Sequence, residues 1–221
     1  MPWQLRRSDS KRRSKWYSVQ DIDHVFKAAP LPKGKVPYYF GCETELPANC
    51  VPALAKENFD RFAFVVIPPN HMHMKGLVRP EGVDTPEKMA VLMEDRLEKL
   101  LECDIPFRKI GIAHLTCSLM FGEGSVADVV SHMNEARLLR IFKGYAQAGA
   151  GIELNIGSFG EWETRPEETM LMYRIAKEAG CLFYACSDAH SVESLSRVPA
   201  LLPKLVKELG LTSADQYRIP V

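Results

Sequence analysis

The sequence has no excess of charge of either sign, because Lys and Arg together number 28 and Asp and Glu together also number 28. A chain without a basic excess is not expected to be a general nucleic-acid-binding protein. No run of 18 apolar residues occurs, so we expect no membrane-spanning helix and no membrane partner. No apolar segment follows the basic N-terminus, which therefore lacks the pattern of a secretory signal. These absences predict a cytoplasmic protein.

Closely paired cysteines are also absent. The six cysteines include no Cys-x-x-Cys pair, and without a signal peptide we expect reduced thiols and no disulfide framework. The Gly-x-Gly segment 122–124 lacks the further glycine and the lysine of a nucleotide phosphate loop. The sequence therefore favours neither a disulfide scaffold nor a nucleotide-binding protein.

The chain has 221 residues, of which 46% are hydrophobic and 25% charged, which suits one domain with a sizeable core. Residues 1–16 are strongly basic and are expected to form a disordered tail. Residues 17–221 contain no long linker and no internal repeat, so we expect them to form a single domain.

Short apolar runs alternate with helical patterns along most of this domain. The runs are 38–42, 62–67, 110–113, 151–156 and 181–186, each apolar on both faces as in buried parallel strands. Helices are predicted over 86–101, from Ser125 to Phe142, from Pro166 to a stop at Gly180, and over 192–209. Strands alternating with helices predict an α/β fold with a parallel sheet.

Polar side chains lie at or near the C-terminal end of all five runs, and this is the end where parallel α/β barrels build their sites. Taken alone, each residue has a structural interpretation: a histidine can be buried and hydrogen-bonded, and an aspartate can cap a helix. The coincidence at five strand ends favours a shared site. The residues are Glu43 and Glu45, then Asn70, His71 and His73, then His114, then Glu153 and Asn155, and finally Ser187, Asp188 and His190.

Imidazoles combined with carboxylates suit Zn, Mn or Fe(II). Such ions lower the pKa of a bound water to about 7 and so supply hydroxide at neutral pH. The residue types therefore predict a metal-dependent hydrolase.

The strand-end motifs resemble, in order, those of the polymerase and histidinol phosphatase (PHP) family. The most specific match is Ser187-Asp188-Ala189-His190, and the resemblance extends from about residue 36 to about residue 200. It implies a distorted seven-stranded (β/α) barrel, two or three ions of Zn, Mn or Fe, and phosphoesterase activity. The matching segments are Gly41-Cys42-Glu43, Val66-Ile67-Pro68-Pro69-Asn70-His71, Ile112-Ala113-His114, Gly151-Ile152-Glu153-Leu154-Asn155 and Cys186-Ser187-Asp188-Ala189-His190.

The resemblance also implies roles for the metal-ligating residues. Glu43 would bridge two ions, and His71 and His114 would complete the ligand set of one of them. Asp188 would help to hold the second ion, and His190 would bind a third. Of these residues, Glu43, His114 and Asp188 are predicted to be catalytic. The predicted reaction is hydrolysis of a phosphomonoester by a metal-bound hydroxide, as in a histidinol-phosphatase-like enzyme.

Three further residues are candidates for contact with a small phosphorylated substrate. His73 is either an extra metal ligand or a phosphate contact, and within 70–73 we favour His71 as the family ligand. Lys75 and Arg79 follow in the same loop and carry the positive charge that a phosphate requires. A solvated loop is the alternative interpretation of these two residues.

One departure from the family divides the functional hypotheses. The Asp-x-His-x-His strand and the later Asp-His strand of the family are both absent, so we expect an incomplete barrel that lacks its first two strands. Such a barrel has an open sheet edge, which favours a homo-oligomer that covers it. The alternative to an enzyme is therefore a catalytically silent relative that binds one metal or none and acts through association. A metal-dependent amidohydrolase is a third hypothesis, although its His-x-His is expected on the first strand.

Overall fold

The computed structural model describes most of the chain. The residues it describes are 22–27, 34–35, 38–74, 77–117, 125–155, 161–189, 191–196 and 198–220. The predicted basic tail, 1–16, lies outside the described residues. No described helix is long and apolar enough to cross a membrane.

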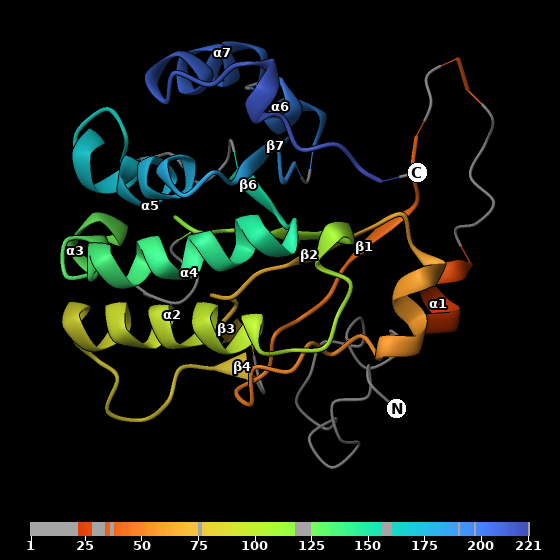
Figure 1. Ribbon diagram of the computed structural model, residues 1–221, viewed down its shortest axis with the longest axis horizontal. Coiled ribbons are helices and arrows are strands. Elements are labelled where there is room, and N and C mark those ends of the chain that lie inside the picture. Colours follow the sequence, from red (N-terminus) through yellow and green to blue (C-terminus); the bar gives the residue numbers. More distant parts are fainter. Residues whose placement is uncertain are drawn as a thin grey trace.

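A five-stranded parallel sheet forms the centre of the fold (Figure 1). Its strands follow one another across the sheet in chain order, and each corresponds to one of the apolar runs. The strands are β1 (Gly41–Glu43), β2 (Phe64–Ile67), β5 (Ile110–Ile112), β6 (Gly151–Asn155) and β7 (Leu182–Cys186). A separate antiparallel pair, β3 (His73–Met74) and β4 (Leu77–Val78), follows β2. The predicted α/β fold with a parallel sheet is confirmed.

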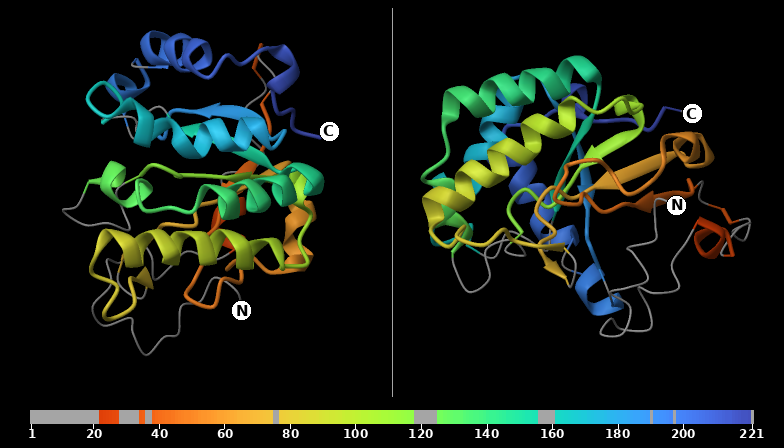
Figure 2. Two further views of the ribbon diagram at one scale, coloured as in Figure 1. Left: turned by 60° about the vertical axis from the view of Figure 1, so that its left-hand side comes forward. Right: turned by 90° about the horizontal axis from the view of Figure 1, so that it is seen from below.

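Helices connect the strands. They are α1 (Ile22–Phe26), α2 (Pro86–Leu101), α3 (Val126–Val130), α4 (Glu135–Ala148), α5 (Pro166–Glu178), α6 (Val192–Leu195) and α7 (Val198–Glu208), together with the 3-10 helices η3 (Lys56–Arg61), η4 (Phe107–Lys109) and η7 (Ser213–Asp215). Figures 1 and 2 show α2, α4, α5 and α7 stacked alongside the sheet in the same order as the strands. This arrangement follows from parallel strands in chain order, because each crossover has the same hand.

Helix starts agree well with the capping residues, but two of the predicted helices are each divided in the structure. The single helix predicted over 192–209 is wrong, because α6 ends at Leu195 and α7 begins at Val198. Thr85 accepts a hydrogen bond from the backbone N–H of Lys88 and caps α2, which begins at Pro86 as predicted. Ser125 caps α3, but the single helix predicted from Ser125 to Phe142 is wrong, because α3 ends at Val130. The side chain of Asn134 accepts from the backbone N–H of Arg137, 2.9 Å away, and starts α4 as a new helix.

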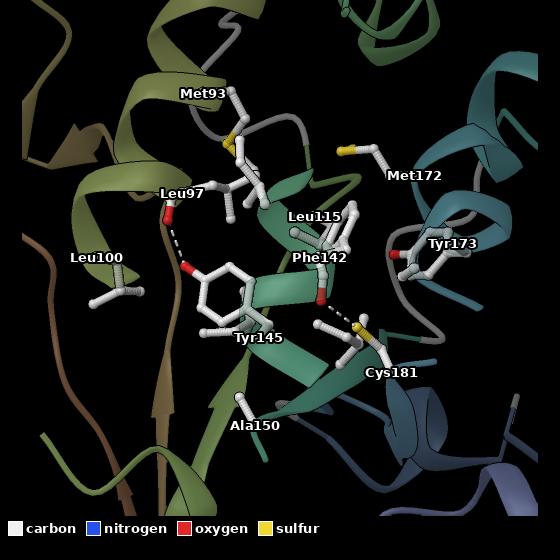
Figure 3. Packing of buried hydrophobic residues seen from close by; sticks show 14 of the residues in the cluster. Met93, Leu97, Leu100, Leu115, Phe142, Tyr145, Ala150, Met172, Tyr173 and Cys181 are labelled. Carbon is white, nitrogen blue, oxygen red and sulfur yellow. Dashed lines mark hydrogen bonds between the residues drawn. The ribbon is translucent and has the colours of Figure 1, made fainter. Parts of the chain in front are cut away.

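The hydrophobic core lies between the sheet and the helices. Val65, Ile67, Ile110 and Ile112 are fully buried on the helix-facing side of the sheet. Figure 3 shows the helical part of this core, in which the hydroxyl of Tyr145 on α4 donates to the carbonyl oxygen of Leu97 on α2. This bond joins two neighbouring helices. It also gives the buried hydroxyl of Tyr145 the hydrogen-bond partner that it would otherwise lack.

Aromatic rings converge on the opposite face of the sheet. The ring centroids of Phe64 on β2 and Tyr184 on β7 are 5.0 Å apart, although β5 and β6 lie between those strands. In a flat sheet this separation would be about 14 Å between the backbones. Gly111 makes the approach possible, because a Cβ there would lie 2.4 Å from the hydroxyl of Tyr184. The sheet is therefore curved toward this face.

Strand β1 forms one edge of the described sheet. It pairs with β2, and no other described strand lies beside it. Tyr38 and Tyr39, just before β1, are 46% and 49% exposed. At the other edge, a bridge between Phe183 and Gln216 extends the sheet beyond β7.

Candidate metal centre

Three predicted ligands meet at the carboxyl ends of neighbouring strands. Glu43 ends β1, His71 follows β2, and His114 follows β5. Each residue offers one ligand atom, and these atoms all lie within 4.8 Å of one another. The sequence separates Glu43 from His114 by some seventy residues, so only the pairing of β1, β2 and β5 brings them together.

The two histidines form the buried part of this cluster. Nε2 of His71 lies 2.7 Å from Nδ1 of His114, and the two side chains are only 9% and 4% exposed. Two imidazoles and one carboxylate are a donor set that suits Zn, Mn or Fe(II). By contrast, the carboxylate of Glu43 is 41% exposed, so the cluster is accessible from solvent on that side.

The carboxylate of Glu45 lies next to Nδ1 of His71, on the side of the ring opposite Nε2. Nδ1 of His71 is 3.2 Å from Oε2 of Glu45 and 3.4 Å from Oε1 of Glu43. Burial lowers the pKa of His71, but the hydrogen bond and charge of Glu45, with the charges of Glu43 and Asp188, outweigh burial and raise it. Glu45 therefore fixes the orientation of the His71 ring while Nε2 faces His114.

Two side chains bond to the backbone of His114 and hold the turn there. The N–H of His114 donates to Oε2 of Glu153 at 2.7 Å, and Nδ2 of Asn70 donates to the carbonyl oxygen of His114. Glu153 is 1% exposed, and burial raises the pKa of its carboxyl group to about 7. The amide of Asn70 also donates to the carbonyl oxygen of Cys117, so one side chain bonds to two points of the loop after β5.

Asp188 reaches the same site from β7. Its Oδ2 lies 3.6 Å from Nε2 of His114, although β6 separates β7 from β5 in the sheet. Asp188 is outside the group of three ligand atoms that lie within 4.8 Å of one another. Asp188 therefore lies next to His114, and the curvature of the sheet brings the end of β7 close to the end of β5.

The other predicted site residues are separate from this cluster or lie outside the described residues. The side chains of His73, Lys75 and His190 are among those not described. Arg79 contacts Sδ of Met89 on α2 at 3.6 Å. The pKa of Asp84 is lowered mainly by its hydrogen bond to Lys88 and by the charge of Lys88, and Arg79 is the last of the contributing groups. The suggested phosphate-binding and third-metal roles of these residues stay predictions.

The sequence places Glu45, Asn70 and Glu153 near strand ends but does not indicate what each of them does at the site. The signal for Glu45 was its spacing, because residues two apart in an extended segment lie on one side of the chain. The roles of Asn70 and Glu153 had no comparable signal, since both act on backbone groups of a distant loop.

Comparison of the chain with protein-family models, with curated proteins and with solved structures found no match. The resemblance to the PHP family therefore depends on the short motifs and on their placement after the strands.

Proposed function

We propose that this chain is a metal-dependent phosphoesterase of the PHP type, with a divalent cation held by Glu43, His71 and His114. The observation that carries the proposal is the convergence of these three ligand atoms within 4.8 Å at the carboxyl ends of adjacent parallel strands. A cation at this position would supply Lewis acidity and a water of lowered pKa. The substrate class that fits such chemistry, by resemblance to the family, is a small phosphomonoester.

The surrounding residues support this role in distinct ways. Glu45 would keep Nδ1 of His71 engaged, which leaves Nε2 as the ligand atom that faces His114. Asp188, 3.6 Å from His114, adds negative charge on the β7 side of the site and favours a bound cation. Three protein ligands leave coordination positions open, as in catalytic zinc sites.

We infer that the fold is an incomplete (β/α) barrel. Parallel strands in chain order with helices alongside are the arrangement of such barrels, whereas doubly wound sheets reverse their strand order. The approach of the rings of Phe64 and Tyr184 across two intervening strands supports closure toward the same side. The edge at β1 is where the barrel would be incomplete.

Hydrolysis of an aryl phosphate by purified protein tests the enzymatic proposal. We expect activity that is lost on thorough chelation, returns with Zn²⁺, Mn²⁺ or Fe²⁺, and is abolished in His114→Ala. The matched control is His132→Ala, because His132 is a partly exposed histidine paired with Glu87 away from the cluster. Activity that survives both chelation and His114→Ala would overturn the proposal.

A catalytically silent relative is the second candidate, and the edge at β1 favours it. Tyr38 and Tyr39 are exposed beside this edge, and the described residues provide one group of three metal ligands. This alternative predicts at most one ion per chain, no hydrolysis and an oligomer that buries the edge. Light scattering combined with elemental analysis distinguishes it from the enzyme.

A further inference from the structure

Arg96 on α2 is a buried cation that bonds to backbone rather than to a carboxylate. Only 2% of the surface of Arg96 is exposed to solvent. Nε donates to the carbonyl oxygen of Pro69, Nη2 to that of Leu46, and Nη1 to that of Pro47 at 3.2 Å. Nη1 also lies 3.9 Å from Sγ of Cys50. All three nitrogens of the guanidinium group are thus engaged.

The three carbonyl groups belong to the loops after β1 and β2, next to the candidate ligands Glu43 and His71. Leu46 and Pro47 directly follow Glu45, in the loop after β1. Pro69 stands two residues before His71, in the loop after β2. One planar side chain therefore bonds simultaneously to the loop that follows Glu43 and contains Glu45, and to the loop that carries His71.

Burying a guanidinium group away from water is unfavourable unless its donors are satisfied. Burial accordingly lowers the pKa of Arg96, and the neighbouring Cys50 and Glu45 only partly oppose this. The rigid fork of an arginine fixes the directions of its N–H groups, whereas a lysine ammonium is a single point on a flexible stem. Arginine is therefore suited to fixing the distance between two separate backbone segments.

We propose that Arg96 is a positioning residue that sets the placement of the loop after β1 relative to the loop after β2, and thereby the convergence of Glu43 and His71. The role in metal binding rests on the proposed function, but the role in loop placement does not. Arg96 acts through the backbone, because its guanidinium group bonds to carbonyl oxygens of the two loops.

The test compares Arg96→Lys and Arg96→Met with Tyr145→Phe. The control removes the buried hydrogen bond from Tyr145 to the carbonyl oxygen of Leu97, the residue next to Arg96, without touching either loop. If Arg96→Met fails to fold, Arg96→Lys carries the test, because it retains the aliphatic stem and the charge. All variants are measured well below their unfolding temperatures.

Two readouts separate the loop role from the metal role. The first is hydrogen exchange without metal at the amides of Ala53 and Leu54, which donate to the carbonyl oxygen of Glu45 and to Oγ1 of Thr44, both at 2.9 Å. The second is Co²⁺ affinity together with the visible spectrum of the bound ion, which reports ligand geometry.

We expect Arg96→Lys to lose about tenfold or more of the protection at Ala53 and Leu54, and about 10- to 100-fold in Co²⁺ affinity, as for outer-shell partners of metal ligands. Tyr145→Phe should leave both readouts unchanged. Protection and affinity within twofold of the wild type in Arg96→Lys would overturn the inference. If the wild type binds no Co²⁺, the proposed function fails, and exchange at Ala53 and Leu54 alone decides the role of Arg96.

Discussion

Nε2 of His114 lies 3.6 Å from Oδ2 of Asp188, and both residues have a backbone in the left-handed region, with φ of 60° and 47°. Among the described residues, the only other non-glycine residue with positive φ is Cys50. This conformation is unfavourable for residues with a Cβ and tends to occur at functional sites. The strain therefore lies at the two turns that bring His114 and Asp188 together.

The strain at His114 predicts a difference between two truncations. His114→Ala and His114→Gly lose the same imidazole, but only alanine keeps a Cβ at φ 60°. We expect the free energy of unfolding of His114→Gly to exceed that of His114→Ala by about 1 kcal/mol in urea titrations. Equal stabilities would show that the turn is not strained, while both variants should lose metal binding.

The buried carboxyl group of Glu153 predicts a pH dependence of stability. Its pKa rises from 4.5 when exposed to about 7 when folded, so between these values the folded state retains a proton that the unfolded state has released. Stability therefore falls as pH rises from about 5 to about 8, by up to about 3 kcal/mol from this group. Measurements need a chelator, so that bound metal does not contribute.

Glu153→Gln isolates that contribution, because the amide oxygen can still accept from the N–H of His114. We expect the variant to be more stable than the wild type at pH 8 and to show a smaller decline between pH 5 and 8. An unchanged pH profile in Glu153→Gln would contradict the assignment of the titration to this residue.

Glu43, at the end of β1, and Glu45, just after it, should differ in their effect on metal affinity. Glu43→Gln removes a ligand, whereas Glu45→Gln removes the carboxylate that accepts from Nδ1 of His71. We expect Glu45→Gln to weaken Zn²⁺ affinity about 10- to 100-fold and Glu43→Gln to weaken it more. The control, Glu57→Gln on η3, changes an exposed glutamate and should have no effect. A stronger effect at Glu45 than at Glu43 would reverse the assigned roles.

Curvature of the sheet makes Gly111 sensitive to substitution. A Cβ at this position would lie 2.4 Å from the hydroxyl of Tyr184 and 2.5 Å from Cζ of Phe64. We expect Gly111→Ala to lower the free energy of unfolding by about 1 to 3 kcal/mol, with partial recovery when Tyr184→Leu makes room. Thermal unfolding of the single and double variants measures this coupling. Additive effects would show that the rings do not meet over Gly111.

The sequence was informative wherever local pattern decides structure. The apolar runs located all five strands of the parallel sheet, and Thr85 and Pro86 located the start of α2. The placement of Glu43, His71 and His114 after successive strands was enough to predict that they converge, because parallel strands present their carboxyl ends at one edge.

What the sequence did not reveal depends on contacts between distant segments. Nothing local distinguishes Arg96 from an exposed arginine on an amphipathic helix, although it is almost completely buried. Likewise, the break between α3 and α4 depends on Asn134, whose backbone N–H donates to Oε1 of the buried Glu94 on α2. Such partners become visible only once the helices are packed together.

Anomalous diffraction at the zinc edge, from crystals soaked in Zn²⁺, tests the central claim most directly. We predict a peak bounded by Glu43, His71 and His114, with Zn–N distances of about 2.0 to 2.1 Å, which disappears in His114→Ala. A fully soaked crystal with no peak among these three side chains, or with a peak that persists in His114→Ala, would contradict the account.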